Sequence, residues 1–215
     1  MPNRTPTTRQ ATGLAGLGAV VLFGAGNALW AFEQPDGGAS AREILAFYTD
    51  NSGWIIAGAS LSLLSIVLFV FFASGIRAIL REHEGDDLLA TAAFGGALLL
   101  VAAGLGAETI NMVGALRAED GSLTRELGRV LFEISYILGF NGAGVGIGIL
   151  LLATAAIALR APAQVVMPRW AGILLLAAGL AFITPLARFL LGPSLLLLLA
   201  VSVHLLRTRE TDSAS

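Results

Sequence analysis

The chain of 215 residues contains no cysteine, and its 13 basic residues are all arginine because no lysine occurs. The absence of cysteine excludes disulfide bonds and thiolate chemistry, and it removes any clue to the redox compartment. The absence of lysine excludes Schiff-base chemistry, and with it a retinal protein or a lysine-dependent enzyme. The bias towards alanine, glycine, leucine and arginine is typical of a GC-rich bacterial genome.

Charged residues are also scarce. They make up 13% of the chain, whereas hydrophobic residues make up 56% and the mean hydropathy is +0.80. A soluble domain carries about 25% charged residues, so this composition favours a membrane protein. The net charge of −2, without a cluster of arginines, gives no reason to expect a nucleic-acid partner. The expected partner is the lipid bilayer.

Six long apolar runs organise the chain. About 20 apolar residues form a helix that spans the roughly 30 Å hydrocarbon core of a bilayer. We therefore predict an all-α polytopic membrane protein, a six-transmembrane-helix bundle. The first run has 22 residues, beyond the roughly 7–15 of a signal-peptide core, so we expect a retained anchor. The predicted spans are residues 11–32, 53–79, 88–115, 128–159, 170–187 and 192–206.

The distribution of arginine predicts the orientation. We expect one transmembrane domain over residues 11–206, with tails at 1–10 and 207–215. Because arginine near span ends is enriched on the cytoplasmic side, both tails are predicted to be cytoplasmic, in the cell membrane. Eight arginines lie on that side (4, 9, 77, 81, 160, 169, 207 and 209) and five on the other (42, 117, 125, 129 and 188).

The longest predicted loop, residues 33–52, contains a helix signal. Ser40 and Glu43 stand three residues apart and form a capping-box pattern. We predict a short amphipathic helix over residues 41–49 on the outer membrane surface or across the mouth of the bundle. The sequence Asp50-Asn51-Ser52-Gly53 is then expected to cap the second span.

Glycines recur within the fourth span. Gly142, Gly144, Gly146 and Gly148 give two overlapping GxxxG pairs, a pattern that lets helices approach closely in lipid. We predict close helix packing there. The alternative is a helix break that lines a cavity.

Glu108 is the candidate centre of a ligand site, because an ionisable side chain on a spanning helix is costly without a partner or a purpose. It lies 20 residues after Leu88, about 30 Å along the helix and so near the outer hydrocarbon boundary. Two hypotheses stay open: a structural carboxylate at the interface, or a cavity carboxylate that binds a cation, proton or polar solute.

Other polar residues fall in the same outer half of the predicted bundle. Arg129 and Glu133 stand at i and i+4, and Arg188 is a candidate partner for Glu108 or Glu133. Together these positions predict a polar vestibule that opens to the outside. The candidate ligand-binding residues are Glu108, Asn111, Glu133, Asn141, Asn27 and Arg188.

No cofactor, metal site or catalytic residue is predicted. The two histidines, His83 and His204, flank the predicted cytoplasmic face and do not form a buried pair of haem ligands. No HExxH or GxSxG motif occurs. Ser62 and Ser65 are interpreted as helix-packing hydroxyls, so an enzyme is not the favoured class.

The run Met167-Pro168-Arg169-Trp170-Ala171-Gly172 opens the fifth predicted span. Through this run and the helix in the long first outer loop, the chain resembles a large group of bacterial six-helix membrane proteins classed only as a domain of unknown function. The resemblance implies the six-helix layout and no active site. Physically, Pro168 suits a first helical turn, and Arg169 with Trp170 suits a cytoplasmic interface anchor.

These observations predict an integral membrane protein that binds or permeates a small polar or cationic solute through an outward-facing vestibule. The alternative is a structural or interaction protein, a scaffold or accessory subunit without a ligand site. Its partner is then a second copy of the chain or another membrane protein.

Overall fold

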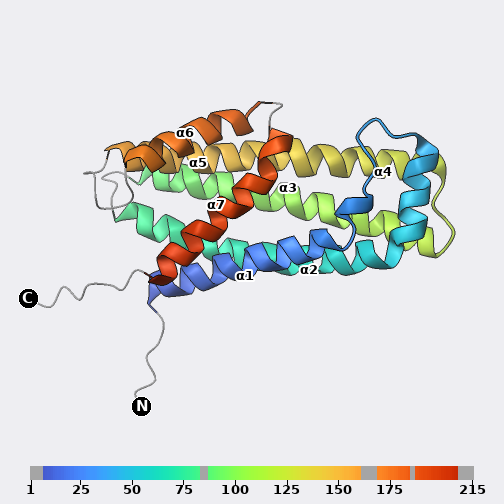
Figure 1. Ribbon diagram of the computed structural model, residues 1–215, viewed down its shortest axis with the longest axis horizontal. Coiled ribbons are helices and arrows are strands. Elements are labelled where there is room, and N and C mark those ends of the chain that lie inside the picture. The colour runs from blue at the N-terminus through green and yellow to red at the C-terminus, as the bar shows by residue number, and fades with distance from the viewer. Residues whose placement is uncertain (1–6, 83–86, 161–168, 185–186, 208–215) are drawn as a thin grey trace, which may run out of the picture.

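The computed structural model describes residues 7–82, 87–160, 169–184 and 187–207, and all regular structure in these ranges is helical (Figure 1). The all-α fold class is therefore confirmed. In chain order the elements are α1 (Thr8–Ala28), the 3₁₀ turn η1 (Ala31–Glu33), α2 (Ala41–Arg81), α3 (Leu88–Glu119), α4 (Arg125–Ile137), the π-helical turn η2 (Leu138–Gly142), α5 (Ala143–Arg160), α6 (Arg169–Phe182) and α7 (Ala187–Arg207).

Four helical stretches are long and apolar enough to cross a membrane: Thr8–Ala28, Ala41–Arg81, Leu88–Glu119 and Arg125–Arg160. The last of these joins α4, η2 and α5 into one rod. The segments Arg169–Phe182 and Pro193–Arg207 are apolar but shorter.

The helices form a bundle in which chain neighbours are also neighbours in space. The pairs α1–α2, α2–α3, α3–α5 and α5–α6 have extensive contacts, and α7 returns across the bundle to pack on α1 (Figure 1). The end of α7 reaches the start of α1, where Leu206 N lies 3.1 Å from the position of a Cβ built on Gly13. The first and last helices therefore begin and end at the same end of the bundle.

Local signals explain where α2 begins. Glu43 N donates to Ser40 Oγ at 3.3 Å, and Ser40 N donates to Glu43 Oε2 at 2.7 Å. These two bonds satisfy backbone donors that the first helical turn leaves free, so the predicted capping box is confirmed.

The helix predicted over residues 41–49 is present but is not a separate element. Helix α2 runs without interruption from Ala41 to Arg81, so the cap predicted at Asp50-Asn51-Ser52-Gly53 is wrong. Figure 1 shows that the first turns of α2 cross one end of the bundle before the helix turns to run along it. Asn51 Nδ2 donates to Phe47 O at 3.1 Å, a bond back to the preceding turn of the same helix.

The boundaries of three other predicted spans also differ. Helix α1 ends at Ala28 rather than at residue 32, because η1 follows a short turn. Helix α6 ends at Phe182, before the predicted residue 187. Helix α7 starts at Ala187 rather than at residue 192, and Pro193 lies inside it.

The fourth predicted span is not a uniform α-helix. A π-helical turn, residues 138–142, separates α4 from α5 and inserts an extra residue into the helical repeat. The turn changes which side chains face the neighbouring helices. Among its residues, Asn141 is exposed.

Glycines bring helix backbones into contact, as predicted for the fourth span. A Cβ built on Gly146 stands 2.7 Å from Gly96 O, and one built on Gly96 stands 2.8 Å from Gly146 O, at the crossing of α3 and α5. A Cβ built on Gly148 stands 3.1 Å from Gly179 O, at the crossing of α5 and α6. Two positions of the glycine pattern therefore serve close packing.

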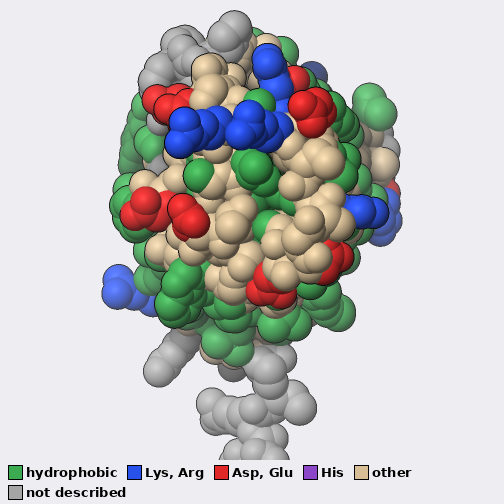
Figure 2. Space-filling view, turned by 90° about the vertical axis from the view of Figure 1, so that its right-hand side faces the viewer, with side chains coloured by type: hydrophobic (Ala, Val, Ile, Leu, Met, Phe, Trp, Pro, Cys, Tyr) green, Lys and Arg blue, Asp and Glu red, His purple; other side chains and the backbone are tan. Residues whose placement is uncertain are grey.

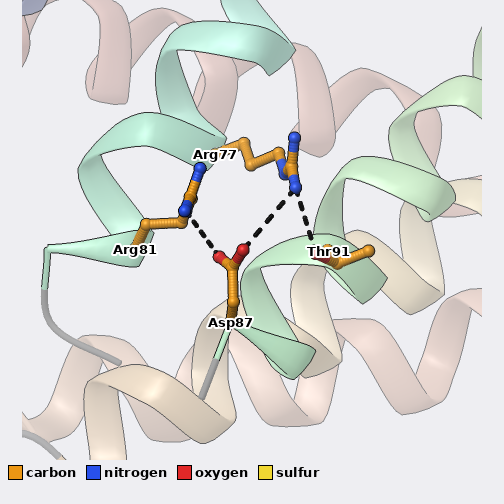
Figure 3. Close-up of polar contacts among 4 residues, drawn as sticks. All are labelled: Arg77, Arg81, Asp87 and Thr91. Atoms are coloured by element: carbon orange, nitrogen blue, oxygen red, sulfur yellow. Dashed lines mark hydrogen bonds and ion pairs between the residues drawn. The ribbon is translucent and has the colours of Figure 1, made fainter. Parts of the chain in front are cut away.

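An ion-pair cluster joins the end of α2 to the start of α3 (Figure 3). Asp87 Oδ1 lies 2.7 Å from Arg81 Nε, and Asp87 Oδ2 lies 3.7 Å from Arg77 Nη2. Arg77 also donates to Thr91 Oγ1 at 3.3 Å, and its guanidinium lies over the ring of Phe94, 5.6 Å from the centroid. Asp87 has a φ of 65°, a left-handed conformation that the two arginine contacts help to hold.

Polar and apolar surfaces are separated along the bundle. Figure 2 views the end where α2 crosses and α3 connects to α4, and it shows acidic and basic side chains on that end with hydrophobic side chains around the flanks. Along the flanks many large apolar side chains are exposed, among them Leu64, Phe71, Leu105, Ile173 and Leu196.

Candidate functional site

Glu108 and Asn111 lie on the buried face of α3. Their exposed fractions are 6% and 7%, so both polar side chains are enclosed by the bundle. They stand one helical turn apart and share a face, as their i, i+3 spacing predicts. Tyr48 and Ser62, both on α2, are their polar neighbours.

Asn111 is held by α2. Tyr48, which is fully buried in the first turns of α2, donates from its hydroxyl to Asn111 Oδ1 at 3.1 Å. Gly114 makes room for this ring, because a Cβ built there stands 2.6 Å from Tyr48 Cε1. The bond ties the segment that crosses the bundle end directly to α3.

An aromatic cluster surrounds the hydrogen bond between Tyr48 and Asn111. Phe47 packs against the ring of Tyr48 with centroids 5.4 Å apart, against Trp30 at 6.2 Å and against Phe132 of α4 at 6.4 Å. All four side chains are buried. The cluster excludes water from the part of the bundle next to Asn111 and Glu108. It also holds in place the first turns of α2, which cross the end of the bundle.

Glu108 lacks a partner for one carboxyl oxygen. Glu108 Oε2 is fully buried and finds no hydrogen-bond partner in the part of the chain that the structure describes. The hydroxyl of Ser62, on α2, lies near the carboxyl group of Glu108, and Ser62 Oγ is itself buried without a hydrogen bond to another described residue. Ser62 has no exposed surface.

Trp30 adds a third unpaired group. Its Nε1 is buried without a partner among the described residues and lies 2.7 Å from the position of a Cβ built on Gly58. A Cβ built on Gly26 of α1 would stand 3.0 Å from Ser62 Oγ. Trp30 and Ser62 therefore both border the crossing of α1 and α2 at Gly26 and Gly58, and Ser62 also lies near Glu108.

We name these three residues the Trp30–Ser62–Glu108 cluster. A buried polar group without a hydrogen bond costs about 1–3 kcal/mol, and an unpaired carboxylate costs more. Native proteins keep such groups rare, so these three require an explanation. A bound solute that forms hydrogen bonds with them supplies one.

The chemistry of the cluster does not suit a protein-bound metal. Glu108 is its one carboxylate, and no group of three or more histidine, aspartate or glutamate side chains in the described ranges is placed to hold a metal ion. The cluster instead offers an acidic group, a hydroxyl and an indole N–H donor.

Glu133 and Arg129 lie elsewhere, on the exposed surface of α4. Glu133 Oε1 accepts from Arg129 Nε at 2.7 Å, which confirms the expected i, i+4 pair. Glu133 also lines a half-open groove of about 170 Å³ beside Gly37 and Tyr136. The carboxylate is therefore already paired and faces solvent.

The remaining predicted residues have separate surroundings. Asn27 is half-buried and donates from Nδ2 to Phe23 O in its own helix at 3.0 Å. Asn141 is exposed within the π-helical turn. Arg188 falls on α7, but its side chain lies outside the described residues, as does the whole of His83. The structure brings together Glu108 and Asn111 of the six predicted ligand residues.

The three partners of these two residues carried weaker sequence signals. Ser62 is predicted to be a packing hydroxyl, and no motif in the sequence marks Tyr48 or Trp30 as a polar contact. Only the spacing of Gly58 and Ser62, one turn apart on one helix face, hinted at a polar position beside a close crossing.

The connection between α3 and α4 contains a carboxylate with a purely local role. Hydrogen bonds from the Ser122 side chain and backbone hold the pKa of Asp120 below its ordinary value; the backbone bond, from Ser122 N to Asp120 Oδ1, is 2.8 Å long. Gly121 supplies the positive φ of 72° that this turn requires. Asp120 therefore stabilises the turn and lies apart from the buried cluster.

Comparisons with known proteins do not assign the chain to a family. No protein-family model matches the chain, and neither the curated proteins nor the solved structures contain a match. The resemblance carried by Arg169, Trp170 and Gly172 stays a prediction, and Met167 and Pro168 lie outside the described residues.

Proposed function

We propose that the protein is an integral membrane protein of the cell membrane that binds a small polar or cationic solute at Glu108. The membrane assignment is supported by four helical stretches of sufficient length and apolarity and by the apolar side chains exposed along the flanks. Exposed apolar surface of this extent is costly in water and favourable in lipid.

Helix lengths suggest where the bilayer lies. Helix α6 is about 21 Å long and α7 about 31 Å, whereas α2 measures about 61 Å along its path. A hydrocarbon core of roughly 30 Å fits around α6 and α7. The crossing segment of α2 and the aromatic cluster then project beyond it, on the side away from the start of α1.

The arginine distribution orients this arrangement, with both termini in the cytoplasm and the projecting end outside. Reporter fusions at the two termini and in the connection at residues 120–124 test the orientation. We expect cytoplasmic reporters to be active at the termini and inactive in the connection. Extraction by detergent but not by alkaline carbonate tests the membrane assignment itself.

One observation carries the solute-binding proposal: three fully buried polar atoms, Trp30 Nε1, Ser62 Oγ and Glu108 Oε2, have no hydrogen-bond partner among the residues that the structure describes. The carboxyl group supplies the charge or the hydrogen bond that would hold a polar or cationic ligand. The aromatic cluster above it keeps bulk water away, which strengthens such an interaction.

Thermal unfolding of the purified protein in detergent tests this proposal. The wild type is compared with Glu108→Gln across a panel of inorganic cations, organic amines and neutral polar solutes. A ligand present at 100 times its Kd stabilises by about 2.7 kcal/mol, which corresponds to a rise in Tm of about 5–10 °C for a chain of this size. We expect at least one such ligand for the wild type and none for Glu108→Gln.

Glu133→Gln is the matched control, because it removes an exposed carboxylate while leaving the cluster intact. It should respond to the panel as the wild type does. If no ligand raises the Tm of the wild type, the solute site is refuted and the structural or interaction role becomes the better account. If Glu108→Ala fails to fold, the carboxylate is chiefly structural.

A further inference from the structure

Asn141 is a polar side chain on the flank of the bundle, away from the buried cluster. It lies in the π-helical turn η2, it is exposed, and its amide forms no hydrogen bond with another residue of the described ranges. Other exposed polar groups on a flank are satisfied locally: the hydroxyls of Ser60 and Ser74 on α2 each donate to a carbonyl of the preceding turn. The amide of Asn141 differs from them, because both its donor and its acceptor are left for a partner.

The depth of Asn141 lies within the hydrocarbon core proposed above. A Cβ built on the next residue, Gly142, stands 3.0 Å from Ala103 Cβ, so this turn is level with Ala103 of α3. Ala103 is 15 residues, or about 22 Å, along α3 from Leu88, and a core of about 30 Å includes that level. The inference therefore rests on the membrane location proposed above, and it is independent of the solute site.

Exposed apolar side chains continue the same flank along the rod of α4, η2 and α5. Val130, Ile134, Ile137 and Val145 are exposed by 50%, 44%, 56% and 39%. From residue 130 to residue 141 the exposed positions are spaced by four, three and four residues, which is the spacing of the apolar seam of a coiled coil. We call Val130, Ile134, Ile137, Asn141 and Val145 the Asn141 stripe.

The neighbouring helices leave the Asn141 stripe uncovered. Helix α6 packs extensively on α5, ends at Phe182, and has no comparable contact with α4 or η2. Figure 1 shows α6 alongside α5, with the flank of α4 lying beyond the end of α6. Helix α7 contacts η2, yet Asn141 stays exposed with α7 in place. Among the described helices, none covers this face.

The amide determines which partner suits the stripe. Lipid chains cover valine and isoleucine well, but they offer an amide neither a donor nor an acceptor. An asparagine amide carries both, so two copies related by a twofold axis can satisfy each other, with Nδ2 of each donating to Oδ1 of the other. One asparagine in an apolar seam also fixes the register and number of the helices that pair there.

We propose that a second copy of this chain docks on the Asn141 stripe, and that the two Asn141 side chains form a reciprocal pair of hydrogen bonds at the twofold axis. The axis runs along the bundle, so both copies have the same orientation in the membrane. The exposed apolar residues on either side of Asn141 pack against their counterparts in the other copy.

Disulfide cross-linking in native membranes tests this arrangement, and the chain suits the method because it contains no cysteine. Ile137→Cys introduces one thiol on the stripe and keeps Asn141. Leu105→Cys is the matched control, because Leu105 is exposed by 48% at a similar depth but lies on α3. Two identical thiols form a disulfide only where their Cα atoms come within about 7 Å, which requires a position near the twofold axis. Mild oxidation should give a covalent dimer for Ile137→Cys and none for Leu105→Cys.

The role of the amide is tested by counting subunits of fluorescently labelled protein in lipid bilayers over a range of protein densities. Asn141→Leu should lower the dimerisation constant by about 3- to 30-fold, the worth of an interhelical hydrogen bond in a membrane. Asn141→Gln, which keeps an amide, should retain most of the dimerisation. Because Asn141 is exposed, both variants should keep the helix content of the wild type, as measured by circular dichroism.

Each contrary result overturns a stated part of the proposal. Equal cross-linking of Ile137→Cys and Leu105→Cys, or a wild type that stays monomeric at every density, refutes the dimer. A cross-link from Ile137→Cys to a different protein refutes the second copy as the occupant. A dimer that Asn141→Leu leaves unchanged refutes the amide pair. None of these results changes the ligand response expected at Glu108, and failure of that response leaves the dimer untouched.

Discussion

The crossing of α3 and α5 provides the sharpest prediction about packing, because two adjacent glycines on α3 have opposite surroundings. A Cβ built on Gly96 stands 2.7 Å from Leu150 N and 2.8 Å from Gly146 O, both backbone atoms. A Cβ built on Gly95 has nothing within 4 Å. Gly96→Ala and Gly95→Ala therefore make the same chemical change at neighbouring positions.

The expected magnitudes follow from these distances. Ordinary contact starts at 3.4 Å, so Gly96→Ala forces the two helices apart by about 0.7 Å. Overpacking costs about 1–3 kcal/mol, and the upper end applies because a backbone cannot rotate away. The gain in helix propensity offsets up to about 1 kcal/mol. We expect Gly96→Ala to lower the free energy of unfolding by about 1–2 kcal/mol and Gly95→Ala to raise it by up to about 1 kcal/mol.

Reversible unfolding in mixed micelles of a mild detergent and a denaturing one measures both values, with helix content followed by circular dichroism. The two variants should differ from each other by about 1–3 kcal/mol, with Gly96→Ala less stable and Gly95→Ala at least as stable as the wild type. Equal stabilities for Gly95→Ala and Gly96→Ala would refute the close backbone crossing of α3 and α5.

Three further variants test local features in the same unfolding assay. Gly114→Ala should lower the free energy of unfolding by about 1–3 kcal/mol, because the new Cβ would stand 2.6 Å from Tyr48 Cε1 and displace the ring from its hydrogen bond. An unchanged free energy of unfolding would mean that the ring is not packed against Gly114. Asp87→Ala should be less stable than Asp87→Asn by about 1 kcal/mol, because asparagine tolerates the left-handed φ of 65° and alanine does not; a reversed order contradicts that conformation. Glu133→Gln should change stability by less than about 1 kcal/mol, because its ion pair is exposed, and a larger loss would indicate a buried role.

Long-range hydrophobic pattern predicted the helical architecture well. Four of the apolar runs are long enough to span a bilayer, whereas Arg169–Phe182 and Pro193–Arg207 are shorter; the all-α class and the approximate positions of the helices followed from composition and length. The capping box of Ser40 and Glu43 is a local signal that depends on two residues three apart, and it correctly marked the start of α2. Glu108 stood out because an ionisable group within an apolar run is rare.

Other features depend on contacts that no local pattern encodes. The sequence around Asn51 and Gly53 resembles a helix cap, yet packing of Phe47 and Tyr48 in the aromatic cluster keeps the helix continuous through it. Here tertiary packing overrides a weak local preference. Helix α7 also begins before Pro193 and continues through it, whereas the predicted span started at residue 192.

The candidate site shows the same division. Asn111 shares a face with Glu108 by helical spacing, which the sequence reveals. Trp30 and Ser62 join them only because α1 and α2 cross at Gly26 and Gly58, and helix crossings are not visible in one sequence. The sequence therefore predicts the positions of Glu108 and Asn111, but it does not predict which residues of the other helices lie near them.

The central claim is that Glu108 is the group that contacts a bound solute, and infrared difference spectroscopy measures this most directly. Spectra of the purified protein are recorded with and without a solute from the panel that raises the Tm of the wild type, in the region of the carboxyl and carboxylate stretching bands, for the wild type and Glu108→Gln. The account predicts a ligand-induced change in these bands for the wild type that is absent from Glu108→Gln. Identical difference spectra for the two proteins, at ligand concentrations that raise the Tm of the wild type, would show that the solute binds elsewhere.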